Sequence, residues 1–198
     1  YTGVPTVFLY GNIDGMETKE DERVVGFNFL SDKISFIKYA KIKIQGSSSL
    51  NYDKKNYTIK LYDNSLCEEE YEVDFGWGKE NKYVMKANWI DKTHSRNIVS
   101  ARIVSSVSKK YGLFENAPNN ASVDGFPVEV YNDGEFLGLY TFNIPKADWM
   151  LGLDEDNEII GYKYVHMGKM MDNIKAGMEP MEAIEKASGK YGRFDDAV

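Results

Sequence analysis

The chain has 198 residues, of which 42% are hydrophobic and 28% are charged, and its formal net charge is −7. This composition is that of a globular protein with a sizeable core, so it excludes a disordered chain. The acidic balance argues against a nucleic-acid partner, because phosphate contacts need clustered lysine and arginine. No apolar run approaches the roughly 20 residues of a membrane span, and the lone Cys67 cannot form an internal disulfide.

Alternation of apolar and polar residues predicts strands along most of the chain. It is cleanest from Tyr39 to Ile44, as in a half-buried strand. The clearest hairpin covers 126–142, where Asp133-Gly134 favours the positive backbone angles of a tight turn. The other predicted strands are 4–10, 24–30, 57–62 and 82–87, and the predicted loops are 12–23 and 68–80.

A helix is predicted to follow the strand 82–87. Asp91, Thr93 or Ser95 can cap its start, because their side-chain oxygens accept the free N–H groups of a first helical turn. Gly112 is a usual helix stop, and the preceding lysines suit the negative end of the helix dipole. One face of this helix carries Ser100, Ile103, Val104, Val107 and Tyr111.

The last forty residues differ in character from the rest. Methionine and isoleucine recur there at roughly helical spacing, and Gly177 and Pro180 divide the stretch into two predicted helices. We therefore expect an α+β domain over 1–160, built of a mostly antiparallel sheet with a packed helix. A methionine-rich helical appendage is expected over 161–198, which either packs on the domain or docks on a partner.

The first candidate site is a turn of small residues followed by two lysines. Gly46, Ser47 and Ser48 separate two predicted strands, and Lys54 and Lys55 lie at the entry to the second strand. Backbone N–H groups of such a turn and nearby ammonium groups can bind phosphate, so the pattern predicts a nucleotide-phosphate site. The alternative is an ordinary polar loop with solvated lysines, because the spacing is neither a P-loop nor a GxGxxG fingerprint.

The second candidate site joins a strand to the predicted helix over 88–97. Asp91 is the nearest acidic partner for Arg96, which the helix dipole disfavours at this end, and the pair would position the helix together with Asn97. The alternative is helix capping with a surface ion pair. His94 is interpreted as a surface residue, since the sequence supplies no partner that would make it a base.

No metal site and no catalytic group are assigned from the residues alone. The acidic run 154–158 offers the carboxylates that Mg²⁺ and Ca²⁺ prefer, but it lacks the glycine and the second ligand group of an EF-hand. It is therefore interpreted as a solvated acidic turn. The nucleophile-elbow, HExxH, HRD and DFG motifs are absent from the sequence.

Four motifs in order resemble the CotH (spore coat protein H) kinase family. The family pattern is a Gly-x-Ser-Ser turn, a Lys-Lys-x-Tyr strand, an Asn-x-x-Asp…Arg-Asn helix start and an Asn-Gly-x-x-x-Gly-x-Tyr hairpin. The resemblance covers residues 37–153. The matching segments are 44–49, 54–61, 82–91, 95–97 and 128–140.

The resemblance implies a fold like the N-terminal lobe of an atypical protein kinase, and an activity that uses ATP and Mg²⁺ to phosphorylate protein substrates such as spore coat proteins. Carried over to this sequence, Lys54 or Lys55 would face the nucleotide phosphates, and the turn at 46–49 would cover them. Asp91 and Arg96 would support the helix beside the cleft.

Two departures from the family pattern leave three functions open. Many members carry a glutamate shortly after the hairpin, where this chain has Ile144-Pro145, a version similar to the CotH-like modules of bacteriophage tail and baseplate proteins and of bacterial surface proteins. The catalytic and metal-binding aspartates of the family have no counterpart here, and Asp195-Asp196 are too isolated to replace them.

The first of the three functions is that of a kinase whose remainder lies elsewhere, because the chain begins at Tyr1 and is expected to be a processed or partial sequence. The second is a non-catalytic structural module of a phage virion, a spore coat or a bacterial cell surface. The third is an extracellular domain that binds a protein or a glycan, as the 14 tyrosines and 3 tryptophans suggest. The partners expected are a protein substrate or neighbouring structural proteins.

Overall fold

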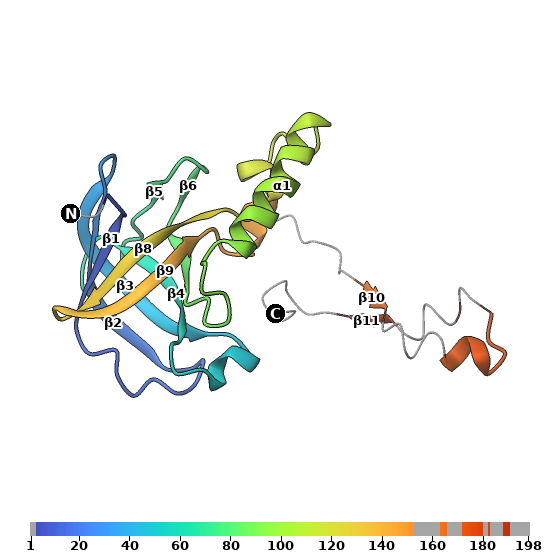
Figure 1. The fold of residues 1–198 in the computed structure, drawn as a ribbon, viewed down its shortest axis with the longest axis horizontal. Coiled ribbons are helices and arrows are strands. Elements are labelled where there is room, and N and C mark those ends of the chain that lie inside the picture. The colour runs from blue at the N-terminus through green and yellow to red at the C-terminus, as the bar shows by residue number, and fades with distance from the viewer. Residues whose placement is uncertain (1–2, 153–162, 166–171, 180–181, 183–187, 191–198) are drawn as a thin grey trace. The chain divides into compact units, whose positions relative to one another are not determined.

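The computed structural model describes residues 3–152, 163–165, 172–179, 182 and 188–190. It divides into two units, the first made of 1–145 with 150–152 and the second of 146–149 with 153–198. The first unit holds a β-barrel, and Figure 1 shows its strands together with one long helix. The barrel strands are β1 (Thr6–Tyr10), β2 (Glu22–Leu30), β3 (Ser35–Gln45), β4 (Asn56–Tyr62), β7 (Lys82–Lys86), β8 (Gly125–Asn132) and β9 (Glu135–Asn143).

The barrel closes in the order β1-β2-β3-β4-β7-β9-β8. Neighbouring strands are antiparallel, except that β1 closes the barrel by pairing in parallel with β8, from Thr6 opposite Glu129 to Leu9 opposite Asn132. The expected α+β fold with a mostly antiparallel sheet is confirmed. Closure into a barrel is a further finding, and it removes most of the free strand edges on which proteins aggregate.

The strands follow the alternation of the sequence. In β3, Ala40, Ile42 and Ile44 are buried while the lysines between them face outward. The hairpin of β8 and β9 turns at Asp133 and Gly134, whose φ values of 46° and 89° are the positive angles predicted for this pair.

An aromatic cluster fills the barrel around Phe142, which is fully buried. The ring of Phe75 lies 5.4 Å from that of Phe142 and 5.1 Å from that of Tyr83. Phe75 belongs to a small hairpin of β5 (Val73–Asp74) and β6 (Lys79–Glu80). The prediction of a plain loop over 68–80 was therefore wrong, because such short strands leave no alternation to detect.

The helix α1 (Arg96–Lys110) packs by Ile98 and two serines rather than by the apolar face that the sequence predicts. Its buried residues are Ile98, Ser105 and Ser108, whereas Ile103 is 61% exposed. Arg102 attaches the helix to the barrel by donating from Nε to Asp124 Oδ1 at 2.8 Å and from a terminal nitrogen to Gly125 O at 2.9 Å. The face predicted from the sequence is exposed at Ser100, Ile103, Val104, Val107 and Tyr111.

Two short 3₁₀ turns, η1 (Ser48–Asn51) and η2 (Pro118–Ala121), belong to the first unit, and a third, η3 (Asp148–Leu151), includes residues of both units. In the second unit, β10 (Lys163–Val165) pairs antiparallel with β11 (Ser188–Lys190). Residues 172–175 are helical, and Gly177 follows with φ of 85°.

Most of the predicted methionine-rich helices and the acidic run 154–158 lie outside the described residues, and the domain boundary at 160 stays a prediction. No helix in the described part of the chain has the length and apolarity that a membrane crossing needs.

We expect Phe142→Ala to lower the free energy of unfolding by about 3–5 kcal/mol, because the change leaves a cavity in the centre of the aromatic cluster. Chemical denaturation monitored by tryptophan fluorescence measures this loss. Phe136→Ala is the matched control on the same strand, since its ring is 57% exposed, and it should lower stability by less than about 1 kcal/mol. Equal losses in the two variants would contradict the described core.

Candidate functional site

The site lies where β7 ends before its neighbour β9. The last pair between these strands joins Lys86 to Thr141, so the ladder stops one residue short of Tyr140. Beyond it, the ammonium group of Lys54 donates a hydrogen bond to the carbonyl of Leu139. A lysine thus satisfies a backbone acceptor that a longer β7 would have paired.

Lys54 is half-buried at this end of the barrel. Its Nζ lies 4.1 Å from the centroid of the Tyr140 ring, a favourable position for a cation. Gly138 leaves room for it, because a Cβ at that position would lie 3.0 Å from Nζ. Withdrawal from water lowers the pKa of Lys54 below its ordinary value. No carboxylate of the described residues pairs with Lys54, so this charge is available to an anion.

Lys55 has a different role from Lys54. Its Nζ donates to the carbonyls of Leu50 at 2.8 Å and Tyr52 at 2.7 Å. Leu50 lies within η1, and Tyr52 is the residue that follows it. Lys55 therefore holds the 3₁₀ turn closed, and the structure separates the two lysines that the sequence left as alternatives.

The predicted phosphate turn is fixed by Gly46 and Ser49. Gly46 has φ of 133°, and a Cβ there would lie 2.0 Å from Ser49 Oγ, so a side chain at this position would displace the turn. Asn56 Nδ2 donates to Ser49 Oγ at 3.1 Å, and Asn56 Oδ1 accepts from the Ala87 amide at 2.8 Å. The turn is thereby tied to the end of β7, with Ser47 and Ser48 exposed on it.

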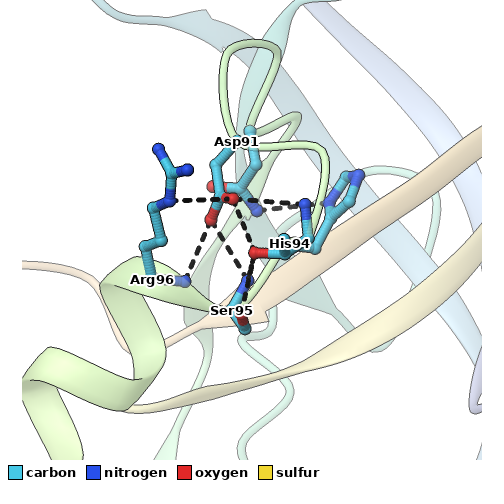
Figure 2. A network of polar contacts seen from close by, with 6 residues as sticks. Asp91, His94, Ser95 and Arg96 are labelled. Carbon is cyan, nitrogen blue, oxygen red and sulfur yellow. Dashed lines mark hydrogen bonds and ion pairs between the residues drawn. The ribbon is translucent and has the colours of Figure 1, made fainter.

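Asp91 organises the start of α1, as Figure 2 shows. Its Oδ2 accepts from the backbone amides of Ser95 at 3.2 Å and Arg96 at 2.9 Å, and its Oδ1 accepts from the Thr93 hydroxyl at 2.6 Å. These hydrogen bonds lower the pKa of Asp91 to about 2, with the Thr93 hydroxyl as the largest cause. Of the three predicted capping residues, Asp91 is therefore the one whose side chain caps the helix.

The other two predicted support residues contribute less. The guanidinium of Arg96 lies 3.6 Å from Asp91 Oδ1 and is 75% exposed, so the predicted ion pair is formed but is weak in water. Asn97 lies exposed on the first turn of α1.

Asn88 and His94 complete the site, and the sequence did not identify their role. Both have positive φ values, 47° and 54°, so the loop between β7 and α1 is sharply bent. Asn88 Nδ2 donates to Thr141 Oγ1 at 2.9 Å and lies 3.4 Å from His94 Nδ1. His94 is half-buried rather than on the open surface. The Asn88-x-x-Asp91 spacing was the only sequence signal, and it pointed to Asp91.

The described residues fit a phosphate group better than a metal ion. Lys54 supplies a cation without a carboxylate partner among the described residues, and the turn at 46–49 carries backbone N–H groups that can bind phosphate. In the part of the chain that the structure describes, no three His, Cys, Asp or Glu side chains come close enough to hold a metal ion.

The model of the CotH kinase protein family matches residues 42–143, just over half of the chain. The chain belongs to the CotH kinase family. The match begins in β3 and ends at the last residue of β9, so it contains the turn, both lysines and the Asp91 network. The kinase-lobe resemblance inferred from the motifs is consistent with this family. No curated protein gives a significant match.

We expect Asp91→Asn to lower the melting temperature near neutral pH, because the amide cannot accept the hydrogen bonds of Ser95 and Arg96 as strongly as the carboxylate does. The folded pKa of about 2 lies below the ordinary 3.8, so the stabilisation is present above pH 3.8 and is lost as the pH falls towards 2. Melting curves across this range should show a steeper loss in the native chain than in the variant. Asp53→Asn, at an exposed carboxylate, is the control, and the account is contradicted if both variants behave alike.

Proposed function

We propose that this CotH-family chain provides the nucleotide-binding side of a protein kinase, with Lys54 as the ligand of the nucleotide phosphates. The observation that carries the proposal is the half-buried ammonium of Lys54, held over Tyr140 without a carboxylate among the described residues. A cation withdrawn from water attracts an anion more strongly than a solvated one does. A half-buried positive charge without an ionic partner favours binding of an anion, and the substrate of a kinase carries phosphate groups.

The turn would bind the same phosphates from the other side. Gly46, Ser47 and Ser48 carry backbone N–H groups at the end of β3, and Lys55 keeps this turn closed through its two carbonyl contacts. Asp91, with Arg96 and Asn97 on the first turn of α1, would keep the helix and the loop 88–95 in place beside the phosphates.

Phosphoryl transfer depends on positioning the γ-phosphate and on neutralising its charge. Lys54 and the turn are suited to binding and orienting the phosphates, and the Mg²⁺ that the family implies would supply further charge neutralisation when it is bound. The described residues offer no carboxylate cluster for that ion. The protein substrate would be a partner of the complete kinase, and its identity is a separate question from nucleotide binding.

One observation favours a second function. Ile144, which is 1% exposed, occupies the region where many family members carry a glutamate. Its amide donates to the carbonyl of Asp124, so the position serves packing here. A CotH-like module that keeps the fold without catalysis, as a structural part of a phage tail or baseplate or of a bacterial surface protein, accounts for this replacement.

We expect Lys54→Met to weaken ATP binding by about 10- to 100-fold, because a hydrogen bond between charged groups contributes about 1.5–3 kcal/mol. Isothermal titration calorimetry with ATP and Mg²⁺ measures the affinity, and a melting curve shows that the variant is folded. Lys110→Met, at the far end of α1, is the control and should bind ATP like the native chain.

A native affinity in Lys54→Met would overturn the role of Lys54. If the native chain itself binds no ATP with Mg²⁺ or Mn²⁺, nucleotide binding is excluded and the structural module becomes the favoured function.

A further inference from the structure

Two nitrogen-bearing side chains are tethered to neighbouring positions of β9, at the point where its pairing with β7 stops. Lys54 Nζ donates to the carbonyl of Leu139. His94 is tethered through Asn88, whose Nδ2 donates to Thr141 Oγ1 at 2.9 Å and lies 3.4 Å from His94 Nδ1. Leu139 and Thr141 are two residues apart on one strand, a separation of about 7 Å. Both tethers therefore lie where the pairing of β7 with β9 stops.

The contact with Asn88 specifies the protonation of His94. With the Asn88 amide nitrogen turned towards the ring, His94 Nδ1 accepts and the ring proton sits on Nε2. His94 is therefore neutral in this arrangement. Burial lowers the pKa of His94, the charge of Lys54 lowers it further, and the carboxylate of Asp91 on the same loop partly opposes these effects.

Binding of an anion would favour the protonated form of His94 over the neutral form. A phosphate beside Lys54 neutralises the charge that disfavours protonated His94 and adds negative charges that favour it. The Asn88 amide can turn its oxygen towards the ring, and the Thr141 hydroxyl can then donate instead of accept. The local hydrogen bonds therefore accommodate either protonation state of the ring.

We propose that His94 is a second phosphate ligand of this site and that it takes up one proton from solvent when the phosphates of a nucleotide bind. The inference rests on the proposed nucleotide-binding function and deepens it, because it makes affinity dependent on pH. Nucleotide binding then tightens as the pH falls through the range in which free His94 is neutral. The gain approaches about tenfold per pH unit, the limit for uptake of one proton.

The test is calorimetric titration of the native chain with ATP between pH 8 and pH 6, in two buffers of different ionisation enthalpy, which reports proton uptake directly. Because ATP itself titrates in this range, the decisive quantity is the difference between the native chain and His94→Gln. We expect the variant to lose most of the gain in affinity at low pH, so that at pH 6 it binds ATP about 5- to 10-fold more weakly than the native chain. It should also take up fewer protons per ATP bound. His166→Gln, at the other histidine of the chain, is the matched control and should match the native profile.

Two results would overturn the inference, and they are distinguishable. If His94→Gln binds ATP with the native affinity and the native pH profile, His94 is not a ligand, while the nucleotide site at Lys54 stands. If the native chain binds no ATP at any pH, the proposed function fails and the inference fails with it. A melting curve of His94→Gln excludes loss of folding as the cause of weaker binding.

Discussion

The hydrogen bond from the ammonium group of Lys54 to the carbonyl of Leu139 lies beyond the last paired residues of β7 and β9. It satisfies a carbonyl that a longer β7 would have paired. Because β7 ends at Lys86, the edge of β9 must be satisfied by something other than a strand. A lysine that performs this task stays partly out of water, with its charge unmatched by any described carboxylate. The same gap in the ladder receives the loop with Asn88 and His94. The candidate site is therefore a consequence of unequal strand lengths in a closed barrel.

The barrel separates the site from the core that stabilises it. Phe75 inserts from the β5–β6 hairpin into the cluster around Phe142, while Tyr140 lies beneath Lys54. The Tyr140 ring lies 6.2 Å from that of Tyr57. Parallel pairing of β1 with β8 closes the cylinder and makes these positions rigid relative to one another. Such a scaffold can hold the groups of a site within small tolerances, which binding through phosphate contacts requires.

The sequence predicted the parts of this structure that depend on local pattern. Alternation located the barrel strands, Asp133-Gly134 located the hairpin turn, and the CotH-like motifs located the segments of the candidate site. Barrel closure was not predictable, because β1 pairs with a strand about 120 residues away and no local signal encodes that contact. The sequence shows an apolar helix face around Ile103, but this face is exposed in the structure. The helix α1 is attached to the barrel by Arg102 and packs by Ile98 and two serines. Lys54 and Lys55 could not be told apart from spacing, and the tertiary contacts of each decide its role.

The proposed role of Lys54 depends on a charge that is withdrawn from water and available to phosphate. NMR spectra of the lysine Cε and Nζ groups, with Lys54 assigned by Lys54→Arg, measure this most directly. We expect Lys54 to titrate below the other lysines, because burial lowers its pKa, and its signal to shift when ATP is added. A Lys54 that titrates with the exposed lysines and does not respond to ATP would exclude this role.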